Sequence, residues 1–345
     1  MIELLCTDYN KKATSIHYYF GNAVLVTGAT GFIGKHLTEA LLLNGNEVVC
    51  VTRKKISDGE FSKPVENIIC DLREIETIDD QMQGIDVVIH AAAQLGHYGI
   101  PYEYYYKVNY LATLKLAELA IKHRVKQFIF CSAPFVTGLE GRNVSEDAPY
   151  HPTNPYSETK MLAEQAVIQR CKNMMPYTIL RPCFVYGAGD VRRTALYRSI
   201  KKKRFVLTTN GKAYLHPTYV SDIVDGFLLS VLNENAYNEI FNLGAEQDCT
   251  VKEYLECIAK YTGSSLIHMN IGYTMSVCLA NVIDGISKVM FKKAGFVNKG
   301  RIDFLAKDHS CDISKARRVL GYAPQINLDT GIRLSVEWAK ENGYL

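Results

Sequence analysis

The sequence predicts an α/β fold built on a doubly wound parallel sheet, followed by a smaller lobe. Two observations carry this prediction. Short apolar, β-branched segments alternate with segments of helical periodicity up to about residue 182, and a glycine-rich turn follows the first of them. Beyond that point the elements shorten and turn signals such as Asn210-Gly211 become frequent. A length of 345 residues accommodates both parts.

The elements of the first part follow from local patterns. Strands that are buried on both faces of a sheet are apolar nearly throughout. This pattern predicts strands at Ala23–Thr27, Glu47–Thr52, Asn67–Asp71, Val87–His90, Gln127–Ser132 and Tyr177–Arg181. Helical periodicity predicts helices at Phe32–Asn44, Glu74–Gln83, Tyr102–His123 and Pro155–Asn173. Residues 1–20 show no clear period and are predicted to form an N-terminal extension.

The turn after the first strand carries Gly28, Gly31 and Gly34 at intervals of three residues. In a strand–turn–helix unit, these glycines make the tight turn, let backbone N–H groups approach a pyrophosphate, and let the helix pack closely on the strand. The helix N-terminus adds unpaired donors and a partial positive charge. The turn therefore predicts a dinucleotide site, although an ordinary strand-to-helix turn is the alternative. Residues 21–182 are accordingly predicted to form a Rossmann domain. Residues 183–345 are predicted to form mostly a substrate-binding lobe, with some segments that return to the sheet.

A second pattern, Tyr156-Ser157-Glu158-Thr159-Lys160, begins the last of the predicted helices. Tyr156 and Lys160 are four residues apart, so they share one helix face. An ammonium group beside a phenol favours the phenolate, and we therefore expect a lowered pKa for Tyr156. A phenol with such a pKa can exchange a proton with an alcohol or a carbonyl. The spacing alone is common by chance, but its place after the fifth strand of a dinucleotide fold makes it specific.

Further short motifs follow in order along the chain: Asp71-Leu72, His90-Ala91-Ala92-Ala93, Val108-Asn109, Arg181-Pro182, Val185-Tyr186-Gly187 and the segment from Asp312 to Tyr322. With these residues the chain resembles the extended short-chain dehydrogenase/reductases, also called the NAD(P)-dependent epimerase/dehydratase family, over roughly residues 22–340. Arg181-Pro182 is typical of the branch that contains 3β-hydroxysteroid dehydrogenases and dihydroflavonol reductases. Many nucleotide-sugar 4-epimerases carry Arg-Tyr-Phe-Asn there instead.

The resemblance implies an enzyme that transfers a hydride between a nicotinamide and a secondary alcohol or ketone of a sugar-, sterol- or flavonoid-like substrate. It implies that Tyr156 is the general acid/base and that Lys160 binds the nicotinamide ribose and tunes the tyrosine. Cofactor contacts are implied at Gly28, Thr30, Gly31, Phe32, Ile33, Gly34, Asp71, Leu72, Ala91, Ala92, Ala93, Asn109, Cys131, Tyr156, Lys160, Pro182 and Val185. Substrate contacts are implied at Gln94, Ala133, Phe135 and His216.

One position departs from the family pattern. The family's third catalytic residue is a serine or threonine after the fifth strand, and an ungapped alignment places Ala133 there. Ser132 precedes it by one residue, and neighbouring strand residues point to opposite faces. We predict that Ser132 serves as the third catalytic residue, with Thr137 or a water molecule as alternatives. Loss of one such donor costs about 2.7–4 kcal/mol, so a weakened site that only senses the dinucleotide is a further alternative.

The end of the second strand predicts which dinucleotide binds. An acidic residue there would bind the ribose 2′-hydroxyl of NAD. Here Thr52 takes that place, and Arg53, Lys54 and Lys55 follow it. Because Arg53 can bind a 2′-phosphate in a charge-assisted fork, with Lys54 beside it, the sequence predicts NADP in preference to NAD. A solvated basic loop is the alternative. A retained NAD would suit a nucleotide-sugar epimerase or dehydratase.

Composition limits the partners. The net charge of +3 indicates no nucleic-acid partner. The run Lys201-Lys202-Lys203-Arg204 is expected to be a solvated helix end, with a rim for an anionic substrate as the alternative. The segment Tyr273 to Met290 predicts an amphipathic helix, which is expected to pack on the protein or, alternatively, to make a weak contact with a membrane surface. The family resemblance also suggests a homodimer.

The ten cysteines show no Cys-x-x-Cys pair, so the sequence predicts no metal site. Several cysteines lie in apolar strands, where a reduced thiol behaves as a small hydrophobic group. No secretory signal pattern is seen at the start of the sequence. We therefore expect reduced cysteines and a cytoplasmic setting.

Overall fold

The structure, a computed structural model, describes residues 21–96, 99–138, 140–291 and 299–345. The predicted N-terminal extension, residues 1–20, lies outside the described residues. At the centre is a seven-stranded sheet, in which every neighbouring pair of strands is parallel. Its strands in spatial order are β12 (Glu239–Leu243), β7 (Tyr177–Pro182), β5 (Gln127–Cys131), β4 (Val87–His90), β1 (Ala23–Thr27), β2 (Glu47–Thr52) and β3 (Glu66–Ile69).

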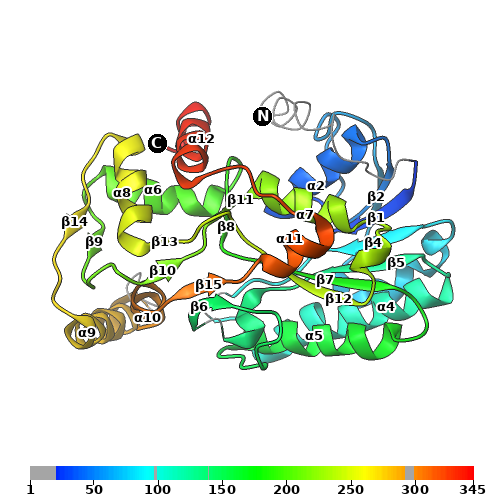
Figure 1. Cartoon of the computed structure of the whole chain (residues 1–345), viewed down its shortest axis with the longest axis horizontal. Coiled ribbons are helices and arrows are strands. Elements are labelled where there is room, and N and C mark those ends of the chain that lie inside the picture. The colour runs from blue at the N-terminus through cyan, green and yellow to red at the C-terminus, as the bar shows by residue number, and fades with distance from the viewer. Residues whose placement is uncertain (1–20, 97–98, 139, 292–298) are drawn as a thin grey trace.

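Helices cover both faces of this sheet (Figure 1). One face packs against α2 (Phe32–Leu43), α7 (Val220–Ser230) and α11 (Ser314–Leu320), and the other against η1 (Leu72–Met82), α4 (Ala112–Lys122) and α5 (Pro155–Cys171). Within β1, Val24 and Val26 join the first core while Leu25 joins the second, as strand alternation requires. The predicted doubly wound α/β fold is therefore confirmed. The strand order reverses between β1 and β4, and ligands bind at such a switch point.

Several predicted boundaries shift for local reasons. The predicted helix Tyr102–His123 consists of α3 (Tyr102–Tyr105), a π-helical turn (Tyr106–Leu111) and α4. The strand predicted at Asn67–Asp71 ends at Ile69, because Asp71 caps η1 by accepting a hydrogen bond from the Arg73 N–H. That element, predicted as an α-helix, is a 3₁₀ helix. The strand predicted to end at Ser132 ends at Cys131.

The second lobe packs beside one end of the sheet and has its own aromatic core (Figure 1). It contains a four-stranded sheet, whose strands in spatial order are β13 (Cys249–Thr250), β10 (Tyr214–Leu215), β15 (His309–Cys311) and β6 (Gly141–Val144). Two further pairs join β11 (Thr218–Tyr219) to β8 (Val185–Tyr186), and β14 (Ile267–His268) to β9 (Val206–Leu207). Its helices are α6 (Thr194–Lys201), α8 (Val251–Thr262), α9 (Tyr273–Phe291), α10 (Lys299–Ala306) and α12 (Leu328–Glu341).

Polar contacts fix this lobe to the first. The His36 ring on α2 pairs through Nε2 with the Ala188 carbonyl at 3.0 Å. Both carboxylate oxygens of Asp222 on α7 accept backbone hydrogen bonds, from Gln325 and Ile326. Within the part of the chain that the structure describes, no helix is long and apolar enough to cross a membrane.

Candidate active site

The glycine-rich turn forms a narrow cradle between β1 and β4. Gly28 adopts a φ of +76°, and a Cβ atom added there would lie 2.8 Å from the Ala92 backbone. A Cβ added at Gly34 would lie 2.0 Å from the Gly28 carbonyl oxygen. At the start of α2, Gly31 provides no capping side chain and the first turn carries no acid, so the N–H groups of Thr30, Phe32 and Ile33 meet no competing anion of the helix itself. The Gly31 N–H donates to the Gly28 carbonyl at 2.8 Å. The residues present therefore fit a dinucleotide pyrophosphate.

A buried hydrogen-bond chain supports the cradle from below. The Thr27 hydroxyl oxygen accepts a bond from the Ala92 N–H at 3.2 Å and lies 2.6 Å from His90 Nδ1. The other ring nitrogen of His90 pairs with the Thr113 hydroxyl at 2.9 Å. Burial, assisted by the nearby Lys160 charge, lowers the pKa of His90 to about 3, so the ring is neutral. The sequence did not identify Thr113, which comes from a distant helix.

Tyr156 and Lys160 lie on the first turns of α5, next to the C-terminal end of β5. A capping box between Asn154 and Ser157 starts this helix. The Lys160 side chain is 1% exposed, and its Nζ donates a 2.6 Å hydrogen bond to the Cys131 carbonyl. The same Nζ lies 3.9 Å from the centre of the Phe130 ring. Tyr156 is half-buried, and its hydroxyl makes no hydrogen bond within the described residues, which leaves it available to a ligand.

The pKa of Tyr156 differs from the expectation. Burial, with a smaller effect of Cys131, raises its pKa, and the Arg192 charge only partly offsets this rise. The expected lowering by Lys160 is therefore wrong for the chain without ligands, because the ammonium is directed at the Cys131 carbonyl. Burial also lowers the pKa of Lys160 to about 8, so the side chain remains mostly charged at neutral pH.

The segment after β5 presents one free hydroxyl. The Ser132 hydroxyl is buried and has no partner among the described residues. Ala133, also buried, has extended backbone, and the 3₁₀ turn Pro134–Thr137 follows it. The Thr137 hydroxyl donates to the Pro134 carbonyl at 2.9 Å, so it already serves its own turn.

Asn109 fixes the segment that faces Tyr156. It lies in the π-helical turn and is 1% exposed. Its amide accepts a hydrogen bond from the Gln94 N–H at 2.7 Å and donates to the Gln94 carbonyl at 3.1 Å. Two residues further on, a Cβ added at Gly96 would lie 3.7 Å from Tyr156 Cβ. Asn109 thus positions residues 94–96 beside the tyrosine.

The end of β2 has exposed cations and no acid. The Thr52 hydroxyl donates to the Lys54 carbonyl at 2.7 Å and accepts from Asn67, so it is already occupied. Arg53 and Lys54 are exposed and form no ion pair within the described residues. Asp71 is bound by its neighbour Arg73, and this interaction lowers the pKa of Asp71 to about 2. Leu72 follows Asp71 and is partly buried.

Four aromatic side chains contact one another in a row from the turn after β5 to the second lobe. The ring of Phe135 lies 6.3 Å from that of His309, which stacks on Phe304 of α10 at 4.9 Å. Phe304 in turn stacks on Phe184 at 5.3 Å. Phe184 lies between Pro182, which ends β7, and Val185, which starts β8. We call Phe135, His309, Phe304 and Phe184 the aromatic wall.

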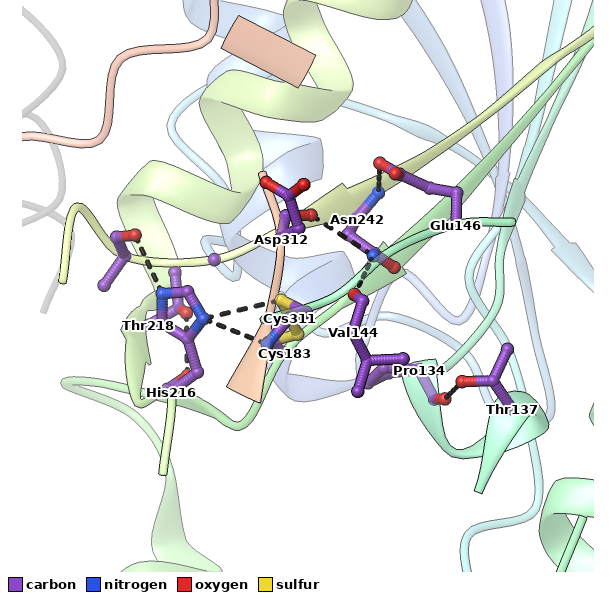
Figure 2. The surroundings of a disulfide bond; sticks show 12 residues. Pro134, Thr137, Val144, Glu146, Cys183, His216, Thr218, Asn242, Cys311 and Asp312 are labelled. Carbon is purple, nitrogen blue, oxygen red and sulfur yellow. Dashed lines mark hydrogen bonds between the residues drawn. A yellow bond between two sulfur atoms is a disulfide. The ribbon is translucent and has the colours of Figure 1, made fainter. Parts of the chain in front are cut away.

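His216 lies in the core of the molecule (Figure 2). Its Nε2 pairs with the Ala245 carbonyl at 2.8 Å, while its Nδ1 accepts from the Cys311 N–H at 3.3 Å. Beside it, Cys183 and Cys311 form a disulfide across 128 residues of sequence. The expectation that all cysteines are reduced is therefore wrong for this pair. Linear spacing could not show it, because the fold brings the end of β7 to β15.

Comparisons with known proteins agree with this geometry. Residues 24–244 match the NAD dependent epimerase/dehydratase family. Sterol-4-alpha-carboxylate 3-dehydrogenase (decarboxylating) of Candida albicans is 26% identical over 93% of this chain and 98% of that protein. N-acetyl-alpha-D-glucosaminyl-diphospho-ditrans,octacis-undecaprenol 4-epimerase of Escherichia coli is 26% identical over 91% of this chain and 94% of that protein. UDP-glucuronic acid 4-epimerase from Bacillus cereus, in complex with NAD, gives a TM-score of 0.73 at 25% identity, covering 93% of this chain and 99% of that chain.

The fold and the site together define a nicotinamide-dependent enzyme of the extended short-chain dehydrogenase/reductase class. The chain belongs to the NAD dependent epimerase/dehydratase family.

Proposed function

We propose that the protein is an NADP-dependent dehydrogenase that interconverts a secondary alcohol and a ketone on a substrate with an apolar skeleton. The observation that carries the proposal is the Tyr156 hydroxyl, which makes no hydrogen bond within the described residues and lies one helical turn before the fixed Lys160, at the C-terminal end of the sheet where the glycine cradle lies. Purified protein incubated with NADPH and a panel of apolar ketones tests it, with nicotinamide absorbance as the readout. An absence of turnover on apolar ketones, with turnover on nucleotide sugars, would reject the substrate class.

The chemistry divides between the cofactor and the chain. A bound nicotinamide supplies the hydride acceptor or donor. In the oxidation direction the Tyr156 phenolate takes the proton of the substrate hydroxyl, while the carbon gives up its hydride. In reduction the Tyr156 phenol returns a proton to the carbonyl oxygen. Lys160 supplies positive charge beneath the site. The buried Ser132 hydroxyl, which has no hydrogen-bond partner among the described residues, donates to the substrate oxygen and thereby gains one.

We propose that the predicted cofactor contacts form one surface along the C-terminal ends of the parallel strands. These contacts are the glycine cradle, Ala91 to Ala93, Cys131, Pro182 and Val185. Gln94, Ala133 and Phe135 are proposed to contact the substrate. His216 is left out of this set, since both its ring nitrogens bond within the protein. The aromatic wall favours flat or isoprenoid hydrocarbon. The names of two relatives, a sterol dehydrogenase and an undecaprenol-linked sugar epimerase, support this class.

We expect Arg53→Gln to weaken NADPH binding by about 10- to 100-fold and to leave NADH binding unchanged. The reason is the loss of a charge-assisted fork to the 2′-phosphate. Lys55→Gln, two residues further along the same exposed loop, is the matched control and should have little effect. Fluorescence titration with NADPH and with NADH measures the two dissociation constants and their ratio. Tighter NADH than NADPH binding by the unmodified chain would contradict the preference for NADP.

We expect Ser132→Ala to lower kcat by about 10²- to 10³-fold while the NADPH-induced rise in melting temperature persists. The companion variant Ala133→Ser restores the family's residue at its usual position. If Ser132→Ala is fully active and Ala133→Ser gains rate, the donor belongs at position 133 and the assignment of Ser132 fails. If no variant turns over any substrate while NADPH still binds, the chain is a dinucleotide sensor.

A second candidate function is redox-neutral epimerisation of a nucleotide sugar with retained NAD. The Bacillus cereus structure supports it, since its title names an epimerase with NAD. The exposed guanidinium of Arg192, held by Asp190 at 3.2 Å and close enough to influence Tyr156, would suit an anionic substrate. Denaturing the purified protein and measuring released NAD separates this candidate from a dehydrogenase that exchanges its cofactor.

We further propose a homodimer through the segment from α3 to α4 together with α5, and a cytoplasmic setting. Seven described cysteines are free, which supports a reducing compartment, while the Cys183–Cys311 bond argues against it. Light scattering tests the homodimer, and cell fractionation tests the cytoplasmic setting.

A further inference from the structure

A buried group of two cysteines and one histidine lies where the second lobe meets the seven-stranded sheet (Figure 2). Cys183 follows β7, His216 lies between β10 and β11, and Cys311 ends β15. Their side chains are 0%, 4% and 1% exposed. The two Sγ atoms and a ring nitrogen of His216 all lie within 4.8 Å of one another. Thiolate and imidazole are the ligands that zinc and other soft metal ions prefer.

Hydrogen bonds direct a lone pair of His216 at the two cysteines. Its Nδ1 accepts from the Cys311 N–H at 3.3 Å and lies 3.5 Å from the Cys311 Sγ (Figure 2). Its Nε2 therefore carries the proton, and donates it to the Ala245 carbonyl at 2.8 Å. Metal-bound histidines have this same arrangement, with one nitrogen on the ion and the other N–H on a backbone carbonyl or carboxylate. A disulfide alone needs no such partner.

The distances match one tetrahedral zinc ion once the disulfide is reduced. With a Zn–S distance of about 2.3 Å and a Zn–N distance of about 2.1 Å, a sulfur and a nitrogen ligand lie about 3.6 Å apart, and two sulfur ligands about 3.8 Å apart. The 3.5 Å between His216 Nδ1 and Cys311 Sγ already meets the first of these values. The Cα atoms of Cys183 and Cys311 are 6.9 Å apart, which leaves room for the sulfur atoms to separate to the second.

Reduction converts the cysteine pair into metal ligands. A thiol reductant supplies two electrons and two protons, which breaks the S–S bond and gives two thiols. A zinc ion then displaces both thiol protons and binds two thiolates and the neutral imidazole. Two thiolates and a doubly positive ion sum to zero charge, which suits a buried site, because uncompensated buried charge is costly. A singly charged copper ion would leave one negative charge in the core.

The remaining cysteines favour the reduced state of the pair. Seven described cysteines are free. In a reducing compartment, neighbouring cysteines serve as metal ligands or in catalysis, and lasting disulfides are rare. Occupation of the site in the cell therefore rests on the proposed cytoplasmic setting. The capacity of the reduced chain to bind an ion rests on the geometry alone, and is independent of the proposed reaction.

We propose that Cys183, His216 and Cys311 of the reduced chain bind one zinc ion, whose fourth position is left to a water molecule. The ion joins the end of β7 to β15 and to the link between β10 and β11, so it fastens the second lobe to the seven-stranded sheet. It also fixes the backbone next to Pro182, a proposed cofactor contact. The sequence predicted no metal site because it was searched for ligands at short spacing, whereas Cys183 and Cys311 are 128 residues apart.

The test is a zinc titration of the full chain, reduced with a phosphine and freed of metal, against a competing chromogenic chelator. We expect one ion per chain at this site, and none there in the chain that keeps its disulfide. Cobalt(II) in place of zinc should show the visible absorption of a tetrahedral cobalt–thiolate centre.

Cys311→Ser should weaken zinc binding by more than about 100-fold, because loss of a ligand exceeds the 10- to 100-fold effect of losing a ligand's outer hydrogen-bond partner. Cys171→Ser is the matched control, since Cys171 is free and equally buried at the end of α5, and it should bind zinc like the unmodified chain. Zinc should also raise the melting temperature of the reduced unmodified chain and of Cys171→Ser, but not that of Cys311→Ser.

Circular dichroism of the reduced, metal-free variants establishes that they fold, and Cys183→Ser takes the place of Cys311→Ser if the latter does not. Two results would overturn the proposal: a reduced unmodified chain that takes up no zinc, or equal zinc affinity of the ligand variant and Cys171→Ser, which would assign the ion to other thiols. Undiminished affinity in a folded His216→Gln would remove the histidine and overturn the assigned set of ligands.

Discussion

Replacement of Tyr156 by phenylalanine is expected to lower kcat by about 10²- to 10⁴-fold, the usual contribution of a positioned proton donor or acceptor. Phenylalanine keeps the ring in its half-buried place and removes only the hydroxyl, which makes no hydrogen bond within the described chain. Folding and NADPH binding should therefore be retained. Steady-state turnover measures kcat, and the melting temperature in the presence and absence of NADPH measures folding and NADPH binding.

The matched control for this variant is Tyr177→Phe. Tyr177 starts β7, at the end of the strands opposite to the end where Tyr156 lies, is buried, and should tolerate the loss of its hydroxyl without loss of turnover. Equal activity of Tyr156→Phe and the unmodified chain would remove Tyr156 from the mechanism, whatever the substrate.

The pH dependence of turnover follows from the direction of the Tyr156 pKa. Oxidation needs the phenolate, so with a raised pKa its rate should climb through alkaline pH. Reduction needs the phenol, so its rate should stay constant through neutral pH. Lys160, whose pKa burial lowers to about 8, adds a change near that pH. A change near pH 8 that survives in the residual activity of Tyr156→Phe would belong to Lys160.

The sequence predicted those parts of the fold that local pattern determines. β1, β2 and β4 begin and end at the predicted residues, because each is a short run of mostly apolar, β-branched residues. The same reasoning located the glycine turn, whose positive φ at Gly28 and close contacts at Gly34 only glycine tolerates. Local spacing also placed Tyr156 and Lys160 on one helix.

What the sequence could not predict depends on contacts between distant segments. The direction of the Lys160 amine depends on how closely α5 approaches Cys131, and this distance decides whether the ammonium can lower the pKa of Tyr156. Asn109 bonds Gln94 from within a π-helical turn that helical periodicity does not distinguish from an α-helix. The pairing of Cys183 with Cys311 similarly depends on the meeting of β7 and β15.

Substitution of Gly34 by alanine is expected to weaken binding of the dinucleotide by at least about tenfold. The added methyl group would lie 2.0 Å from the Gly28 carbonyl oxygen and 2.7 Å from its carbon. No side-chain rotation relieves a contact with backbone, so the turn must move away from α2, and strain of this kind costs about 1–3 kcal/mol. Isothermal titration with NADPH measures the loss of affinity.

Two companion variants keep this expectation testable if Gly34→Ala does not fold. At Gly31, where φ is −77°, an added Cβ would lie 3.1 Å from the Gly28 carbonyl oxygen, so Gly31→Ala should fold and weaken binding to a smaller extent. Gly285→Ala adds a methyl group on α9 with nothing within 4 Å among the described residues, and should change neither binding nor stability noticeably. Undiminished NADPH affinity in both Gly31→Ala and a folded Gly34→Ala would show that the turn does not carry the pyrophosphate. The dinucleotide would then have to bind away from the β1–β4 switch point, and the placement of Tyr156 beside its nicotinamide would lose its basis.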